Sequence, residues 1–410
     1  MFIMNKIELL SPAGDLEKLK IAIDYGADAV YCSGEHFGLR SGARNFTTEN
    51  LAKGLDYAHT RGRKLYLALN VFAHNEDLKG IEDFMDEISD LPVDAFLISD
   101  PGILRWMKVN RPTANLHLST QANTTNKISA LYWHEQGIKR IVLARELSLK
   151  EIAEIREYTP NTLELEAFVH GAMCISYSGR CLLSSYMTGR DSNRGECAHP
   201  CRWHYSVVEE KRPNEYYPVI EDVRGTYIFN SKDLCMIRHL PKLIEAGLSS
   251  LKIEGRTKSI FYTAAVTGAY RKAIDAYMKE GYNWVFRDEW LKEIGKASHR
   301  LYTTGFYFGK PGAEDQNYDS SQYIRDYDFT GLVKSYDSSS QLATVEQRNK
   351  MSVGDEIEIS GPGIEPFLQT LDFMTDENGI PIEDAPHAQQ ILKIRVKQPV
   401  SENYMVSIPK

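Results

Sequence analysis

Short apolar runs alternate with amphipathic stretches along most of the chain before residue 280. Runs rich in β-branched and aliphatic residues predict strands at 7–10, 28–31, 64–70, 95–99, 115–120, 140–145 and 163–169, with an eighth at 250–254. Intervening segments have helical periodicity, as at 16–25, 51–61, 149–158, 233–246 and 259–279. Because parallel strands need a crossover between them, usually a helix, this repetition predicts a (β/α)8 barrel of the TIM type.

An open, doubly wound α/β sheet is the alternative fold with the same alternation of strands and helices. Dinucleotide-binding proteins of that fold carry a GxGxxG turn after the first strand. Here the first predicted strand leads into Ser-Pro-Ala-Gly-Asp at 11–15, which lacks that spacing. The barrel is therefore the favoured fold.

A glycine-, arginine- and serine-rich segment, residues 171–232, interrupts the repetition after the seventh predicted strand. Within it, 205–210 and 216–222 alternate between apolar and polar residues as the strands of a hairpin do. Barrel enzymes place their active sites at the carboxyl ends of their strands. We therefore expect this Cys-rich insertion to overhang the active-site end of a barrel domain that covers residues 1–280.

The pattern changes after residue 280. An aromatic and polar connecting segment, 281–327, precedes short alternating stretches separated by turn residues. These stretches lie at 330–336, 342–347, 355–360, 389–396 and 404–408. They predict a small antiparallel β-barrel over residues 328–410.

The bulk composition is typical of a globular enzyme: 410 residues, 42% of them hydrophobic, with a net charge of −8. No run approaches the roughly 20 apolar residues of a membrane helix, and the N-terminus has no signal-peptide core. We expect a cytoplasmic protein without membrane contact, in which thiols stay reduced. The acidic charge disfavours a generic nucleic-acid binder, although arginines near the cysteines leave local phosphate binding open.

The cysteines are concentrated: five of the six lie between Cys174 and Cys235. Structural cysteines are usually scattered as small buried residues, whereas thiolates that bind a metal must converge. The thiol count alone fits structural zinc and an iron–sulfur cluster equally. Cys32 lies far from the others in sequence and is expected to be a packed or free thiol.

The segment 166–184 reads Glu-x-Phe-x-x-Gly-Ala-Met-Cys-x-x-x-x-Gly-x-Cys-x-Leu-Ser. Together with Ser-Pro-Ala-Gly at 11–14, Asn-Ser-Lys-Asp-Leu at 230–234 and Lys-Ile-Glu-Gly-Arg at 252–256, it resembles the signature of the collagenase-like peptidases of family U32. The resemblance extends over nearly the whole chain. Within the family, the sequence is most similar to the branch that hydroxylates tRNA.

This resemblance implies properties that composition does not. The tRNA-hydroxylating branch converts wobble uridine to 5-hydroxyuridine and carries an iron–sulfur cluster of the [4Fe–4S] type on four cysteines. It is associated with the dicarboxylate prephenate, the expected hydroxyl donor, rather than with molecular oxygen. Related members hydroxylate ribosomal RNA or quinone precursors, and others were named as peptidases. The implied partners are tRNA, a small dicarboxylate, and a homologous subunit or a second copy of the chain.

For the cluster, Cys174, Cys181 and Cys197 are the expected metal ligands. Both Cys201 and Cys235 are available as the fourth, and we favour Cys235 because it stands where the chain re-enters the predicted barrel. Zinc remains the alternative metal.

A peptidase reading finds little support in sequence motifs. His134-Glu135 begins like HExxH, but Ile138 stands where the second histidine belongs. No GxSxG elbow is present. Thiolates committed to a cluster would not be available as nucleophiles.

Several charged residues stand at or near the predicted carboxyl ends of strands, where a dicarboxylate would bind to guanidinium or ammonium groups. The expected anion-binding residues are Arg40, Arg44, Arg145, Lys252 and Arg256. Glu166, His170 and Glu254 are the candidates for acid–base catalysis. Each cation taken singly fits a surface ion pair better, and only their joint placement at strand ends makes anion binding an equal alternative. One of Glu166 and His170 would also fit a role in orienting the loop.

Overall fold

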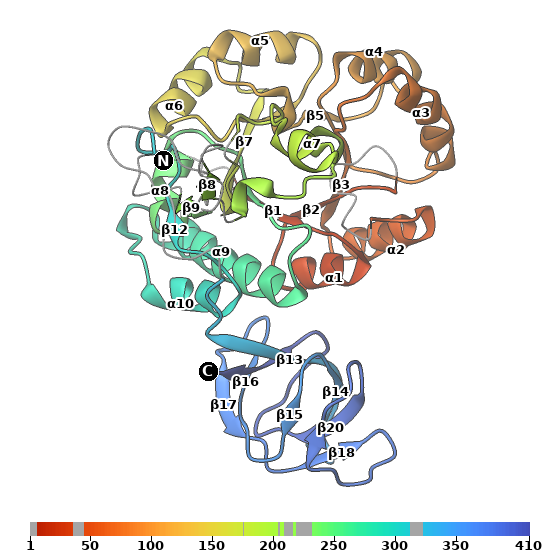
Figure 1. Cartoon of the computed structure of the whole chain (residues 1–410), viewed down its shortest axis with the longest axis vertical. Coiled ribbons are helices and arrows are strands. Elements are labelled where there is room, and N and C mark those ends of the chain that lie inside the picture. Colours follow the sequence, from red (N-terminus) through yellow and green to blue (C-terminus); the bar gives the residue numbers. More distant parts are fainter. Residues whose placement is uncertain are drawn as a thin grey trace.

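A closed barrel of eight parallel strands forms the larger part of this computed structural model (Figure 1), which describes residues 6–35, 45–174, 176–203, 206–208, 216–218, 232–311 and 323–410. The strands are β1 (Glu8–Pro12), β2 (Ala29–Cys32), β3 (Lys64–Leu69), β4 (Ala95–Ile98), β5 (Leu116–Leu118), β6 (Arg140–Val142), β7 (Glu164–Ala172) and β11 (Ser250–Ile253). β11 pairs in parallel with both β7 and β1, which closes the ring. The predicted (β/α)8 fold is confirmed, and closure excludes the open-sheet alternative.

Helices surround this ring, each placed by an apolar face. They are α1 (Leu16–Asp24), α2 (Thr48–His59), α3 (Asn75–Glu87), α4 (Pro101–Asn110), α5 (Lys127–Glu135), α6 (Leu149–Tyr158), α8 (Leu240–Glu245) and α9 (Ile260–Glu280). The side chains of Asp15, Thr47 and Ser148 accept hydrogen bonds from first-turn amides and so fix where α1, α2 and α6 begin. Such N-caps stabilise a helix by about 1 kcal/mol each.

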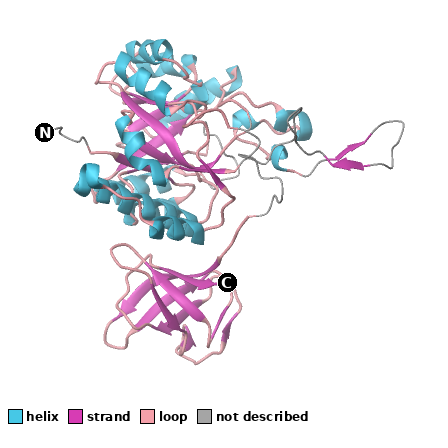
Figure 2. Ribbon diagram, turned by 90° about the vertical axis from the view of Figure 1, so that its left-hand side faces the viewer, coloured by secondary structure: helices cyan, strands magenta, loops and turns pink. Residues whose placement is uncertain are grey.

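The Cys-rich insertion projects from the carboxyl end of the barrel (Figure 2). It contains α7 (Leu183–Thr188), the short 3-10 turns η2 (Ser192–Arg194) and η3 (Pro200–Arg202), and the strands β8 (Ser206–Val208) and β9 (Tyr216–Pro218). β8 and β9 pair antiparallel, as the alternating pattern predicted. In the view down the barrel, α7 lies over the ends of the strands (Figure 1).

The predicted helix at 233–246 is wrong in its first half. Residues Asp233–Cys235 form strand β10, followed by a 3-10 turn, η4 (Ile237–His239), before α8 begins. β7 is longer than its neighbours, and β10 pairs antiparallel with its protruding end. β12 (Tyr302–Thr303), within the predicted connecting segment, extends this pairing on the other side of β10. The backbone partners offered by β7 override the local helical pattern.

The C-terminal part is an antiparallel sheet that curls into a half-barrel. Its order is β17 (Phe367–Thr370), β16 (Glu356–Ser360), β21 (Met405–Pro409), β13 (Tyr327–Asp337), β14 (Leu342–Gln347), β20 (Ile391–Arg395) and β18 (Met374–Asp376). A separate pair, β15 (Met351–Ser352) and β19 (Asp384–Ala385), lies beside it. The prediction of a small antiparallel β-domain in this part of the chain is confirmed.

Polar contacts join the half-barrel to the helices of the larger domain. Arg348 forms an ion pair with Glu17 at the start of α1. Lys296, at the end of α10 (Asp288–Lys296), lies 2.5 Å from the Glu358 carboxylate. Within the described ranges, no helix is long and apolar enough to cross a lipid bilayer.

Candidate active site

A cavity of about 140 Å³ lies at the carboxyl end of the barrel, under the Cys-rich insertion. Strand-end residues such as Tyr31, Asn70 and Lys252 line it from the barrel side, and cysteines line it from the insertion. This is the end at which barrel enzymes carry their active sites. The prediction that the insertion overhangs this end therefore agrees with the structure.

Four cysteines line this cavity: Cys174, Cys181, Cys197 and Cys201. Burial raises the pKa of the Cys174 thiol, and the neighbouring Cys181 and Cys197 add to that effect. Among the described residues, no three His, Cys, Asp or Glu side chains are close enough together to hold a metal ion as they stand. In kind, the four thiols match the donor set of a zinc or iron–sulfur site.

Cys235, the fourth ligand favoured from sequence, lies elsewhere. It is buried on β10, paired across the sheet with His170, and is absent from the cavity lining. Burial raises the pKa of this thiol to about 11. Cys201, the alternative fourth ligand, is in the cavity lining. Cys32 is fully buried at the end of β2, as expected for a packed thiol.

Three of the predicted anion-binding cations line the same cavity: Arg145, Lys252 and Arg256. Arg145 lies 3.2 Å from the Glu254 carboxylate and 4.0 Å from the ring centre of Phe168. The Lys252 ammonium lies 4.2 Å from the ring centre of Tyr31. Arg40 and Arg44 fall outside the described residues.

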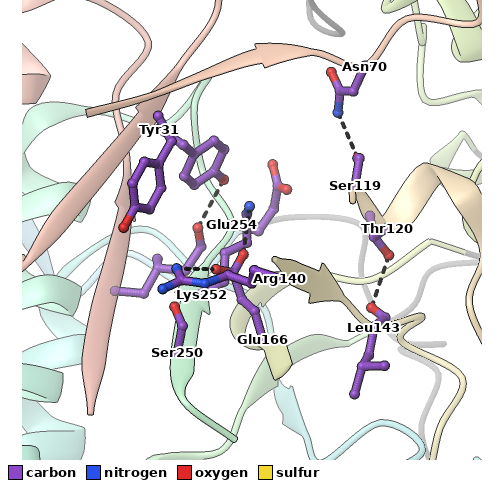
Figure 3. Close-up of polar contacts among 12 residues, drawn as sticks. Tyr31, Asn70, Ser119, Thr120, Arg140, Leu143, Glu166, Ser250, Lys252 and Glu254 are labelled. Carbon is purple, nitrogen blue, oxygen red and sulfur yellow. Dashed lines mark hydrogen bonds and ion pairs between the residues drawn. The ribbon is translucent and has the colours of Figure 1, made fainter. Parts of the chain in front are cut away.

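Glu166 is a buried counter-ion of Lys252 (Figure 3), and the cavity lining does not include it. Its carboxylate lies 3.0 Å from Lys252 Nζ and 3.1 Å from Arg140. Burial alone would raise the pKa of Glu166, but these two cations lower it to about 2. Glu166 therefore stays charged and positions the Lys252 ammonium in the cavity wall, without lining the cavity itself.

His170 also lies outside the cavity lining. Its ring is enclosed by Tyr262, Tyr270 and Tyr302, with ring centres 5.6–5.9 Å away. Burial lowers the pKa of His170 to about 3, with smaller contributions from Lys258 and His299. A histidine that is neutral at physiological pH and sealed among tyrosines supports the sheet. It does not reach a substrate in this cavity.

Glu254 is the one predicted acid–base residue in the cavity lining. It follows β11, and its backbone packs closely on β7 at Gly171. Gly171 has φ +107°, and a Cβ there would lie 2.6 Å from the Glu254 carbonyl oxygen. This contact explains the glycine of the sequence signature, because only glycine combines that φ with so close an approach.

A row of polar side chains lies on the opposite wall of the cavity, where Asn70 was expected from its place at a strand end and where Ser119 and Thr120 were missed. The Asn70 amide donates to Ser119 Oγ (2.9 Å), and Thr120 Oγ1 donates to the Leu143 carbonyl (3.1 Å), as Figure 3 shows. Ser119 and Thr120 immediately follow β5, just as Asn70 follows β3. Polar residues directly after apolar strands were the available signal. They give this wall donors and acceptors suited to a polar ring or a carboxylate.

Comparison with known proteins places both parts of the chain in one group. The sequence matches the model of Peptidase family U32 over residues 14–317 and that of the Peptidase family U32 C-terminal domain over residues 325–406. It is 44% identical to tRNA hydroxylation protein P1 of Bacillus subtilis, covering 98% of this chain and 95% of that relative. It is 38% identical to tRNA hydroxylation protein P of Escherichia coli, with coverages of 98% and 96%. A relative from Porphyromonas gingivalis named Collagenase is 31% identical, with coverages of 97% and 96%.

Proposed function

The chain belongs to peptidase family U32, and from this membership and the site geometry we propose that it is an iron–sulfur-dependent enzyme that hydroxylates the wobble uridine of tRNA. The observation that carries the proposal is one cavity in which four thiols face three cations and a row of amide and hydroxyl groups. The names of relatives that match nearly the full chain supply the substrate class.

The four thiols of Cys174, Cys181, Cys197 and Cys201 would hold the cluster. Exchanging the C5 hydrogen of uridine for a hydroxyl group removes two electrons from the base. With prephenate as the hydroxyl donor the exchange balances, because the C–OH bond of the donor becomes C–H as the C5–H bond of the base becomes C–OH, so the donor takes up the two electrons. A cluster with four cysteine ligands would supply electron transfer there. Zinc on the same thiols lacks redox chemistry, so metal analysis distinguishes the two.

The chain's own residues would bind and orient the dicarboxylate and the uracil ring. Arg145 and Arg256 offer planar guanidinium groups to the carboxylates of a small dicarboxylate such as prephenate. Lys252, held by Glu166, adds a charge at a fixed position. Asn70, Ser119 and Thr120 face the other side, where their donors and acceptors match the edge of a uracil ring.

Replacing Arg145 by lysine should weaken dicarboxylate binding about tenfold to a hundredfold, because the charge stays but paired hydrogen bonds of about 1.5–3 kcal/mol are lost. Calorimetric titration of the anaerobic protein with prephenate measures the change. Arg61→Lys is the matched control, since Arg61 is half-exposed and lies away from the cavity. Equal affinities of wild type and Arg145→Lys would remove Arg145 from the anion site.

The proposal as a whole is tested by deleting the gene in a strain without a redundant enzyme and measuring tRNA nucleosides by mass spectrometry. We expect 5-hydroxyuridine derivatives to disappear and to return when the wild-type chain is supplied. Unchanged levels in the deletion strain would refute the tRNA assignment.

A peptidase is the second candidate, favoured by the relative named Collagenase. It requires an activated nucleophile. His170 and His117 are buried outside the cavity, and burial lowers the pKa of each to about 3. His199 lines the cavity together with Cys197 and Cys201, so a thiol–histidine pair is the arrangement that a peptidase would use here. Assay of the purified protein on gelatin tests for peptidase activity, and we expect no cleavage.

A further inference from the structure

A second, larger hollow opens beside the cysteine-lined cavity. This interdomain cleft, about 660 Å³ in volume, lies between the carboxyl end of the barrel and the half-barrel. Its lining includes Trp203, Lys258, Arg300, Tyr323 and Arg325. Ala172, His199 and Glu254 line both hollows, so the cleft adjoins the cavity.

The cleft is locally basic on a protein of net charge −8. Lys258 and Arg325 form no ion pair with a carboxylate of the described residues. The carboxylates in the described lining, Glu254 and Asp328, are each paired with a cation from outside it, Arg145 at 3.2 Å and Lys410 at 2.9 Å. The charge left facing the cleft is therefore positive, which complements a polyanion.

Aromatic rings accompany these charges. The Lys258 ammonium lies 4.4 Å from the ring centre of Tyr323, and the Arg300 guanidinium lies 4.8 Å from it. Trp203, on the insertion, is 46% exposed although it is large and apolar. Proteins that bind single-stranded nucleic acid place cationic side chains along its phosphate backbone and aromatic side chains where the bases can stack on them. Double-stranded RNA offers no unstacked base to such a surface.

We propose that the interdomain cleft binds the single-stranded loop of the RNA substrate, with Lys258 and Arg325 on phosphates and Trp203 stacking on a base next to the target. The inference rests on the proposed function and specifies how the substrate is held. The target base leaves the stack and enters the cavity through the rim shared by Ala172, His199 and Glu254, as enzymes that modify bases require.

The test is fluorescence anisotropy with a labelled hairpin RNA whose loop contains uridine, measured over a range of salt concentrations. Lys258→Glu combined with Arg325→Glu should raise Kd at least about tenfold. It should also flatten the log–log salt dependence by about 0.7 for each phosphate that the variant no longer binds. Trp203→Ala should weaken binding about five- to hundredfold with an unchanged salt slope, since it removes stacking and no charge.

Lys397→Glu is the matched control, because Lys397 is exposed on the half-barrel and does not line the cleft. Melting temperatures establish whether each variant folds. If the charge-reversed double variant does not fold, the neutral double variant, Lys258→Gln with Arg325→Gln, replaces it. Variants that bind as tightly as wild type would overturn the cleft proposal while leaving the proposed function standing. Failure of the wild type to bind any tRNA loop would overturn both.

Two competitors identify the occupant. A fully paired RNA of the same length should displace the hairpin poorly, and equal displacement would contradict single-strand binding. Denatured collagen should not displace it. Displacement by that polypeptide, with the same dependence on Lys258 and Arg325, would mean that the cleft serves a protein chain instead.

Discussion

Replacing Cys201 with serine is expected to leave the purified protein without bound iron and sulfide, whereas Cys235→Ala should retain both at wild-type levels. The reason is position: Cys201 lines the cavity with Cys174, Cys181 and Cys197, and Cys235 is buried on β10 outside it. Iron and acid-labile sulfide, together with the visible absorption of anaerobically purified protein, measure the difference. Because ligand binding and folding are coupled, the melting temperature of Cys201→Ser should fall as well.

The matched variant Cys235→Ala removes one buried sulfur and should cost only about 1 kcal/mol of stability. Loss of iron from Cys235→Ala with retention in Cys201→Ser would reverse the assignment and restore the ligand set favoured from sequence. A zinc-containing, colourless wild type that retains full cellular function would remove the redox role of the cluster.

Replacing Glu166 with glutamine is expected to lower the free energy of unfolding by about 3–5 kcal/mol, because it leaves the buried Lys252 ammonium without the carboxylate paired with it. Glu164→Gln is the control: Glu164 also pairs with Arg140, at 2.6 Å, but its side chain is 48% exposed. That change should cost less than about 1 kcal/mol. Urea unfolding measures both, and similar values for the two variants would contradict the role given to Glu166.

The pH dependence of the same pair gives an independent check. The pKa of Glu166 is about 2 in the folded protein, below the value of about 4.3 expected in the unfolded chain. Its contribution to stability is therefore complete above about pH 4.3 and is lost as the pH falls through 2. The difference in unfolding free energy between wild type and Glu166→Gln should shrink over that window and stay constant at neutral pH. A difference that persists below pH 2 would exclude an electrostatic cause.

The barrel was predictable because its signals are local. Each strand is a short apolar run with a helical pattern after it, and side chains such as Ser148 mark helix starts. The segment 233–235 was not predictable in this way, since its strand exists only because β7 protrudes beyond β6 and offers backbone partners. The protruding end of β7 is available only in the folded barrel, and the amino-acid composition of 233–235 does not indicate it.

The site residues divide along a similar line. Glu166, Phe168 and His170 alternate along β7, and simple alternation would direct all three into the barrel. The consecutive residues Lys252 and Ile253 pair with Phe168 and His170, so β7 carries one extra residue there. This irregularity changes the phase of β7, and His170 lies among the tyrosines of the barrel wall. Whether Cys201 or Cys235 reaches the cavity likewise depends on how the long insertion folds back, which spacing along the chain does not determine.

The most direct test of the central claim is turnover in a defined mixture without oxygen. Anaerobic protein carrying its cluster, tRNA from a deletion strain and prephenate should yield 5-hydroxyuridine detectable by mass spectrometry, and Cys201→Ser should yield none. No product from iron-loaded wild type, or full product from the Cys201→Ser protein, would contradict the account.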